Sequence, residues 1–196
     1  SDLTILEDFE APAGTVEVTA TVIDDDNDGI PSALEGQDTG QDSDGDGVPD
    51  NSDEFINDPD IAFVSYMPGE NTFGTLAFED RWPSTGDYDL NDIVIDYNFS
   101  EFRNINNQVI KTRATFVLRA MGAGLKNGFG FETNLLPSQI SSVAGSILEE
   151  GIISVASNGV EENQGKATII VFDNGYNVMN NPGGFVNTEV GQPLIE

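Results

Sequence analysis

Two acidic segments of twelve residues follow one another near the start of this chain, and they restrict its folding more than any other feature. They read DDDNDGIPSALE at residues 24–35 and DSDGDGVPDNSD at residues 42–53. In each segment acidic side chains occupy positions 1, 3 and 5, glycine occupies position 6, and a carboxylate occupies position 12. Alternate side chains can converge on one ion and glycine permits a sharp turn, so this spacing is typical of calcium loops.

The predicted ligands stand at loop positions 1, 3, 5, 7, 9 and 12, and position 7 contributes its backbone carbonyl. They are Asp24, Asp26, Asp28, Ile30, Ser32 and Glu35 in the first loop and Asp42, Asp44, Asp46, Val48, Asp50 and Asp53 in the second. We therefore expect at least two Ca²⁺ ions as cofactors.

The charge of the chain supports this expectation. The formal net charge is −28, no Lys or Arg precedes Arg81, and fourteen acidic residues lie between Asp24 and Asp60. Such a segment repels itself unless cations neutralise it, which predicts that calcium binding and folding are coupled. The alternative is an acidic disordered linker, although random acidity would not place glycine at position 6 twice. The same charge argues against nucleic acid and anionic membrane surfaces as partners.

The flanking sequence does not fit an EF-hand, which needs a helix on each side of its loop. Residues Thr15–Ile23 (TVEVTATVI) alternate apolar and polar side chains with the period of a strand, and Gly36–Gln41 leaves no room for paired helices. The tandem pattern over residues 24–60 resembles thrombospondin type 3 repeats. That resemblance implies an almost structureless chain wrapped around a row of calcium ions.

Cysteine and histidine are both absent. Their absence removes disulfides, thiol nucleophiles, Ser-His-Asp triads and most zinc, copper and haem sites. Loops of this kind bind well where calcium is plentiful, so we expect an extracellular or bacterial cell-surface location. No signal peptide or transmembrane run is evident, which argues against direct membrane insertion, and the start at Ser1 without Met favours a mature, processed product over an excised piece.

From residue 61 onward, short apolar runs alternate with Gly, Asn and Pro turns, which predicts an all-β fold of the β-sandwich or jelly-roll type. Asn127–Gly128 and Asn174–Gly175 are candidate hairpin turns, and residues 137–145 suggest a helical turn. The predicted strands lie within residues 61–67, 73–80, 92–99, 108–121, 127–133, 151–156 and 166–179. The expected organisation is an N-terminal β-strand segment (1–23), a calcium-binding repeat module (24–60) with irregular backbone, and a β-sandwich (61–196).

A second acidic motif, FEDRWPSTGDYDLNDIVIDYNF at residues 78–99, runs into one of the apolar segments. Its candidate metal ligands are Asp87, Asp89, Asn91 and Asp92. Alternate residues project to one side of an extended chain, and Glu79 and Asp80 lie near enough in sequence to complete an oxygen cage. Asp92 stands where a calcium loop has glycine, so a capped turn of self-bonding Asp and Asn side chains is the alternative.

This part of the chain is similar to the LruC family. The matching stretches are WPSTGDYDLNDIVIDY (82–97), AMGAG (120–124) and NGFGF (127–131), with a weaker match that ends at Asn174–Gly175. The resemblance covers most of residues 61–196. It implies an extracellular or surface-attached β domain, frequently preceded by acidic repeats, and it implies no known catalysis.

The segment Thr15–Ile23 needs a partner, because a lone strand cannot satisfy its own backbone donors and acceptors. It either joins the sandwich of its own chain or completes the sheet of a neighbouring subunit, as in strand-donating filaments.

Together these features predict a non-catalytic, calcium-binding structural or adhesion module. The alternatives are a filament subunit assembled by strand donation and a carbohydrate-binding module, so the expected partners besides calcium are like subunits or surface glycans and proteins. A glycan-active enzyme would need an acid and a base such as Glu79 and Asp87, but nearly every acidic cluster already fits a metal site.

Overall fold

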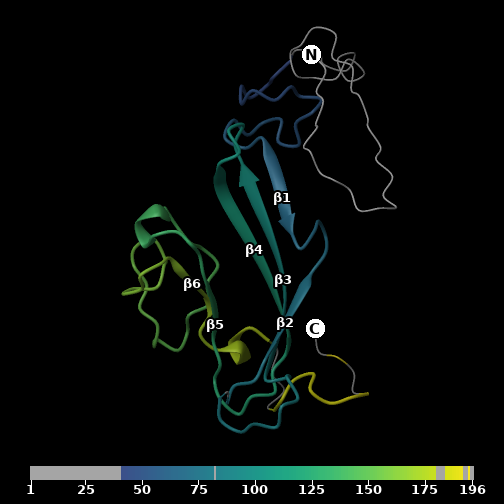
Figure 1. The fold of residues 1–196 in the computed structure, drawn as a ribbon, viewed down its shortest axis with the longest axis vertical. Helices are drawn as coiled ribbons and strands as arrows, with labels where there is room; N and C mark the ends of the chain where they lie inside the picture. The colour runs from purple at the N-terminus through teal and green to yellow at the C-terminus, as the bar shows by residue number, and fades with distance from the viewer. Residues whose placement is uncertain (1–40, 82, 180–183, 192–193, 195–196) are drawn as a thin grey trace, which may run out of the picture. The chain divides into compact units, whose positions relative to one another are not determined.

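The structure, a computed structural model, describes residues 41–81, 83–179, 184–191 and 194. Over these residues the fold is all-β, as predicted, and the helical content is limited to two short 3-10 turns (Figure 1). The elements are β1 (Phe63–Met67), β2 (Gly74–Phe78), β3 (Ile93–Arg103), β4 (Val109–Ala120), β5 (Phe129–Glu132), η1 (Pro137–Gln139), β6 (Thr168–Phe172) and η2 (Gly175–Asn177). The predicted N-terminal strand segment (1–23) and the first calcium loop (24–35) lie outside the described residues.

The chain divides into two compact units. One holds residues Ser1–Ser65 and Glu101–Thr112, and the other holds Tyr66–Ser100 and Arg113–Glu196. The described part of the acidic segment, residues 41–60, therefore lies in the same unit as Glu101–Thr112, which includes the end of β3 and the start of β4.

β3 is the central strand of the larger sheet. β2 pairs antiparallel with its first five residues, beginning with Gly74 opposite Tyr97, and β1 and β4 also pair with β3. Glycine suits position 74 because a Cβ there would lie 2.6 Å from the Tyr97 ring. β5 and β6 form a second, two-stranded antiparallel sheet, whose register shifts between Phe129 and Gly130.

Aromatic rings pack between the two sheets of the second unit. Phe99 of β3 lies edge-on to Phe131 of β5 with ring centroids 5.5 Å apart, and Phe116 of β4 lies edge-on to Phe129 at 5.2 Å. Such pairs contribute about 0.5–1.5 kcal/mol each beyond their buried area. The buried core beside these rings consists of Ile93, Ile95, Leu118, Met121, Phe172 and Val186. The two sheets are therefore packed face to face in the manner of a β-sandwich.

Six of the seven predicted strand regions contain a strand. The exception is residues 151–156, where a single bridge between Val155 and Glu161 is formed. The period of apolar residues located strands such as β3 and β4 because one face of each is covered by the aromatic layer or the core. The predicted helical turn near residue 137 is also present, as η1.

The two predicted hairpin turns were wrong. Asn127–Gly128 precedes β5 without joining two paired strands, and Gly175 begins η2 after β6. Both glycines instead allow close packing. A Cβ on Gly128 would lie 2.9 Å from the Phe172 carbonyl oxygen, and a Cβ on Gly175 would lie 2.5 Å from the Met121 sulfur. The dipeptide alone does not distinguish a turn from a close approach.

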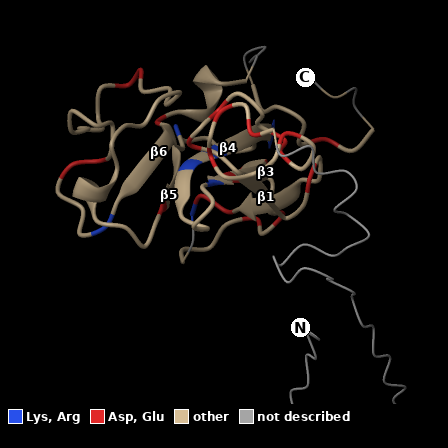
Figure 2. Cartoon of the chain, turned by 90° about the horizontal axis from the view of Figure 1, so that it is seen from above, with Lys and Arg blue, Asp and Glu red and all other residues tan. Residues whose placement is uncertain are grey.

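Basic residues are few and lie largely on the strands, whereas Asp and Glu lie mostly in the connecting segments (Figure 2). Arg103 belongs to β3, and Lys111, Arg113 and Arg119 belong to β4. These four are more than half of the seven basic residues of the chain. The connecting segments therefore carry their negative charge with little compensation from their own sequence.

Asp96 forms an ion pair with Arg119 across the sheet, and its replacement by Asn should destabilise the fold. Its carboxylate accepts hydrogen bonds from the Thr75 hydroxyl and the Arg119 Nε, both at 2.6 Å. The Thr75 bond, followed by Arg119, lowers the pKa of the Asp96 carboxyl below its usual range. Because the folded pKa is depressed, the contribution is present above the unfolded pKa of about 3.9 and disappears as the pH falls through the folded value.

We expect Asp96→Asn to reduce the free energy of unfolding by about 1 kcal/mol at neutral pH. The difference from the wild type should shrink toward zero below about pH 4, as measured by urea unfolding across the acid range. Glu132→Gln, which removes a carboxylate from the exposed pair with Lys166, is the control and should change stability little. A deficit of Asp96→Asn that is independent of pH would contradict this account.

Candidate metal centres

The second calcium loop is anchored within the first unit by apolar side chains. Val48, at loop position 7, is buried, and Phe55, just after the loop, lies edge-on to Phe102 with centroids 5.7 Å apart. At the start of the loop, the Asp50 amide donates a hydrogen bond to the Gln41 carbonyl at 2.8 Å. These contacts hold the acidic loop in a closed shape.

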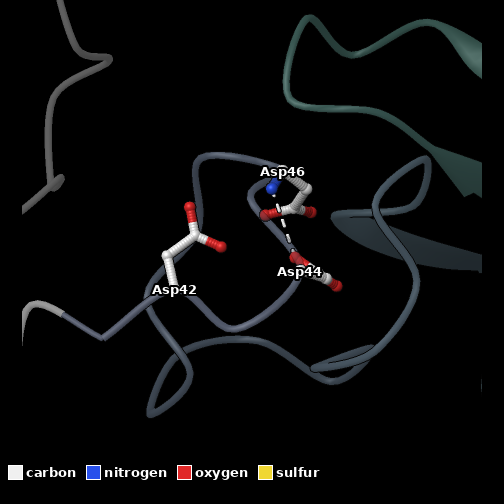
Figure 3. A group of neighbouring side chains, drawn as sticks. All are labelled: Asp42, Asp44 and Asp46. Atoms are coloured by element: carbon white, nitrogen blue, oxygen red, sulfur yellow. Dashed lines mark hydrogen bonds between the residues drawn. The ribbon is translucent and has the colours of Figure 1, made fainter.

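Three carboxylates of this loop point toward one another (Figure 3). One oxygen from each of Asp42, Asp44 and Asp46 lies within 4.8 Å of the others. Oxygens that each lie 2.3–2.6 Å from one Ca²⁺ are at most about 5 Å apart, so the spacing suits a shared ion. No Lys or Arg among the described residues forms an ion pair with these three carboxylates.

Backbone amides orient the three side chains. The Asp42 carboxylate accepts from the amides of Gly45 (2.7 Å) and Gly47 (3.1 Å), Asp44 Oδ1 accepts from the Asp46 amide (3.2 Å), and Asp46 Oδ1 accepts from the Val48 amide (2.7 Å). Gly47 has a φ of 99°, which confirms the predicted sharp turn at position 6.

Two oxygens of the group have no hydrogen-bond donor. The Oδ2 atoms of Asp44 and Asp46 are inaccessible to solvent and unpartnered. A buried carboxylate oxygen without a donor is unfavourable, and a cation would satisfy it. Burial raises the pKa of the Asp46 carboxyl above its usual range, and the nearby carboxylates of Asp44, Asp53 and Asp42 raise that pKa further.

Other predicted ligands of the second loop have different partners. The Asp50 carboxylate accepts from the Ser43 amide (2.7 Å) and hydroxyl (2.8 Å), and Asp53 Oδ1 accepts from the Phe55 amide (2.6 Å). The structure therefore brings together positions 1, 3 and 5 and leaves positions 9 and 12 outside the group. All six predicted ligands of the first loop, from Asp24 to Glu35, lie outside the described residues.

A second carboxylate group forms in the second unit, between β2 and β3. One oxygen from each of Glu79, Asp87 and Asp89 lies within 4.8 Å of the others. Glu79 Oε1 accepts from the Leu90 amide at 2.6 Å, whereas its Oε2 is buried without a partner. The segment reaches this shape through left-handed backbone at Tyr88 (φ 58°) and Leu90 (φ 55°). Such backbone costs about 1–2 kcal/mol per non-glycine residue, so the surrounding contacts must maintain it.

The structure places Asn91 and Asp92 differently from Asp87 and Asp89. The Asn91 amide group donates to Asp89 Oδ2 at 2.5 Å, which is the self-bonding contact of the alternative prediction. Asp92 is buried, and its Oδ2 accepts from the Asp80 amide at 2.8 Å. Burial raises the pKa of Asp92, and the carboxylates of Asp80, Glu79 and Asp87 add to the shift. Glu79, which the sequence marked only as a neighbour, joins the carboxylate group in their place.

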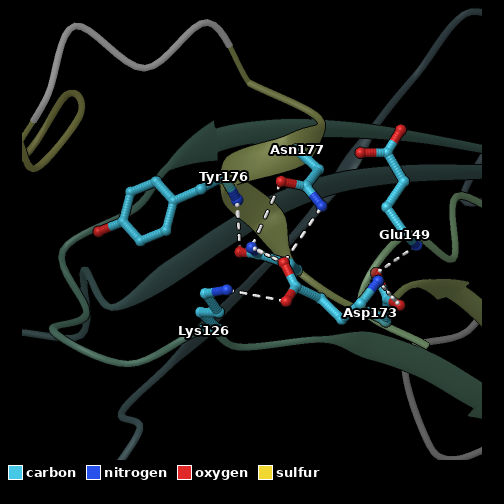
Figure 4. A network of polar contacts seen from close by, with 7 residues as sticks. Lys126, Glu149, Asp173, Tyr176 and Asn177 are labelled. Carbon is cyan, nitrogen blue, oxygen red and sulfur yellow. Dashed lines mark hydrogen bonds and ion pairs between the residues drawn. The ribbon is translucent and has the colours of Figure 1, made fainter. Parts of the chain in front are cut away.

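A third polar cluster contains the carboxylates of Asp173 and Glu150 together with their hydrogen-bond donors (Figure 4). The sequence did not reveal this cluster. The Asp173 carboxylate accepts from the amides of Glu149 (3.1 Å) and Glu150 (2.7 Å). The Glu150 carboxylate accepts from Lys126 (2.8 Å) and the Asn174 amide group (2.7 Å), and these donors lower the pKa of Glu150. Nearby donors satisfy these two carboxylates, in contrast to the two carboxylate groups above.

Removing one charge from the first carboxylate group should stabilise the calcium-free protein. In Asp46→Asn, the amide oxygen can still accept from Val48, while the repulsion of its three neighbouring carboxylates is removed. We expect the melting temperature in excess EGTA to rise by about 2–4 °C, which corresponds to about 1 kcal/mol for a chain of this size.

Glu54→Gln is the matched control, because it removes one negative charge from an exposed position beside the loop. Its melting temperature should change less. A fall in the melting temperature of Asp46→Asn under the same conditions would show that the three carboxylates do not repel one another significantly.

One protein family matches part of this chain. The family model described as a domain of unknown function, DUF4842, matches residues 107–195, which is less than half of the chain. The matched region includes β4, β5 and β6, and both carboxylate groups lie outside it. No curated protein and no solved structure matches this chain. Among the described residues, no helix is long and apolar enough to span a membrane.

Proposed function

We propose that this chain is a calcium-binding structural or adhesion module of the cell surface or extracellular space, without catalytic activity. The observation that supports it most is the group formed by Asp42, Asp44 and Asp46. Their oxygens lie at the separation that one ion requires, and two of the oxygens are buried without a donor.

The donor set favours a hard cation. Every clustered ligand is a carboxylate oxygen, and the chain contains no Cys or His with which to bind softer metals. Mg²⁺ demands near-ideal octahedral geometry and releases its water reluctantly, whereas Ca²⁺ accepts six to eight oxygens in a flexible arrangement. A loop whose carboxylates are oriented by backbone amides suits the flexible coordination of Ca²⁺ better than the octahedral coordination of Mg²⁺.

Calcium would act as the cross-link of the acidic segment. The ion binds the folded loop and not the unfolded chain, so tenfold excess over the dissociation constant adds about 1.4 kcal/mol of stability per site. The first loop repeats the spacing of the second, which supports a second ion there. Residues 24–60 would then be a stiff spacer, which is also what their resemblance to thrombospondin type 3 repeats implies.

An extracellular or surface location follows from the same chemistry, because loops of this class are occupied where calcium is abundant. The resemblance of residues 61–196 to the LruC family supports the same location. In this proposal the β-sandwich presents the interaction surface, and the calcium loops form a stiff spacer on its N-terminal side.

The Glu79–Asp87–Asp89 group is proposed as a weaker calcium site. Its carboxylates have the same separation, and Glu79 Oε2 is buried without a donor. One oxygen of this group is buried without a donor, compared with two in the first group, so burial favours an ion less strongly here.

Calcium should raise the melting temperature of the wild type. The effect of Asp46→Asn on stability should have opposite signs in EGTA and in calcium. In EGTA the variant is expected to be the more stable protein. In saturating calcium it should be the less stable, because the loop loses a charged ligand. Isothermal titration calorimetry should show a loss of affinity of at least about tenfold at one site, equivalent to about 1.4 kcal/mol.

Glu54→Gln again serves as the control and should retain the affinity of the wild type. A chain whose melting temperature is the same in calcium and in EGTA, with no heat of binding, would refute the proposed function.

Glu79→Gln tests the second group separately. The amide keeps an oxygen for the Leu90 amide but removes the charge on the unpartnered side. We expect calorimetry to lose only the weakest binding step, by about tenfold or more, while the tighter steps are unchanged. Glu132→Gln, which alters an exposed carboxylate on β5, is the control. An unchanged isotherm for Glu79→Gln would show that this group binds no calcium and forms only a capped turn.

A further inference from the structure

The polar cluster around Glu150, in the second unit, holds an amine and a side-chain amide on the two oxygens of one carboxylate (Figure 4). Lys126 Nζ donates to Glu150 Oε2 at 2.8 Å, and Asn174 Nδ2 donates to Glu150 Oε1 at 2.7 Å. Lys126 precedes β5, and Asn174 follows β6. An amine nucleophile, a carboxylate that can move a proton and a carboxamide are the groups that an amide bond between two side chains requires.

A backbone hydrogen bond holds the two reacting segments together. The Gly175 amide donates to the Asn127 carbonyl at 2.9 Å. Asn174 and Lys126 are the residues directly before these two. The fold therefore places the amine and the side-chain amide near each other before any reaction, which removes much of the entropy cost of their encounter.

The Glu150 carboxylate is fixed and ionised. Asp173 Oδ2 accepts from the Glu150 amide at 2.7 Å, which positions the backbone of this residue. The hydrogen bond from Lys126, followed by that from Asn174, lowers the pKa of the Glu150 carboxyl. An ionised carboxylate in contact with both reactants can accept a proton from the attacking nitrogen and pass it to the departing nitrogen.

The side-chain amide of Asn174 is buried and polarised. Asn174 is 3% exposed, and its Oδ1 accepts from the Tyr176 backbone amide at 3.0 Å. This donor would stabilise the negative charge that develops on Oδ1 when a nucleophile attacks the carbonyl carbon. Burial also limits the access of water, which would otherwise compete with the amine for the same carbon.

The amine reaches the cluster from solvent. The Lys126 side chain is 67% exposed, whereas that of Glu150 is 22% exposed. An exposed ammonium can give its proton to water, and the flexible four-carbon stem of lysine can turn toward Asn174 without displacing buried groups. The nucleophile is therefore mobile, while the carboxylate and the amide are held in place.

We propose that Lys126 and Asn174 form an isopeptide cross-link, with Glu150 as the catalytic residue. The neutral Lys126 amine attacks Cγ of Asn174, so that the Nζ–Cγ bond forms. Glu150 takes one proton from Nζ and transfers it to Nδ2. The Cγ–Nδ2 bond then breaks, the carbonyl is restored and one ammonia leaves. The carboxylate returns to its initial state, and no oxidant, metal or cofactor is consumed.

The cross-link would give this chain a covalent connection that it cannot obtain from disulfides, because it contains no cysteine. It joins the segment before β5 to the segment after β6, so it closes a loop that contains both strands of the smaller sheet. Closing a long loop restricts the unfolded chain and stabilises the folded one. Neither carboxylate group contributes a residue to the reaction, so the cross-link does not depend on calcium binding.

A second lysine of the same unit provides a matched control. Lys166 Nζ lies 3.1 Å from Glu132 Oε1 and 3.5 Å from Asn134 Oδ1. Asn134 is exposed, so its side-chain amide is open to water. Because this group lacks the buried amide of the first, we expect no cross-link at Lys166.

The experiment measures the intact mass of the full-length protein after incubation at about pH 9, where a larger share of lysine amines is neutral than at pH 7. The wild type should lose the mass of one ammonia, and proteolysis should release a branched peptide that joins Lys126 to Asn174. Lys126→Arg retains the positive charge beside Glu150 but has no amine, so it should keep its full mass. Lys166→Arg should lose ammonia as the wild type does.

Glu150→Gln tests the catalytic carboxylate. The amide oxygen can still accept a hydrogen bond, but the side chain can no longer take a proton from the amine. We expect the cross-linking rate to fall by at least about a hundredfold. Far-UV circular dichroism that matches the wild type shows that each variant is folded.

A folded wild type that keeps its full mass after prolonged incubation would overturn the proposal. Loss of ammonia that persists in Lys126→Arg would also overturn it, because that loss would come from a succinimide at an Asn-Gly pair such as Asn174–Gly175. Equal rates in Glu150→Gln and the wild type would overturn the role given to Glu150.

Discussion

Mutual repulsion between carboxylates is the constraint on which this structure depends most. Asp42, Asp44 and Asp46 direct oxygens to within 4.8 Å of one another, and no cation among the described residues pairs with them. The fold maintains this unfavourable arrangement with backbone amide bonds and with the buried Val48 beside it. Carboxylates that are held together while they repel one another favour binding of a cation, since a bound cation would offset the repulsion.

The β-sheets of the second unit differ from this arrangement. The aromatic layer between the two sheets includes Phe99, Phe116 and Phe131. Carboxylates in this framework have donors, as Asp96 and Asp173 show. The contrast indicates that the unpartnered oxygens of Asp44, Asp46 and Glu79 are specific to the carboxylate groups and not a general property of this acidic chain.

Spacing in the sequence was informative where the geometry is local. The positions 1, 3 and 5 of the second loop come together because each is within a few residues of the turn at Gly47. The prediction was less complete for the second motif. Glu79 reaches Asp87 and Asp89 only because β2 and β3 pair, which brings the residue after one strand next to the residues before the other. The two hairpin predictions were wrong for a similar reason. Gly128 and Gly175 pack against Phe172 and Met121, which are distant in sequence.

The sequence by itself determined the all-β class, the positions of most strands and the spacing of the acidic loops, because these depend on residue periods and on turns of a few residues. Only the tertiary structure decided which carboxylates meet and which of the described oxygens lack a donor. Those features arise from strand pairing and side-chain burial between segments far apart in the chain. Their energies depend on three-dimensional neighbours that no local pattern specifies.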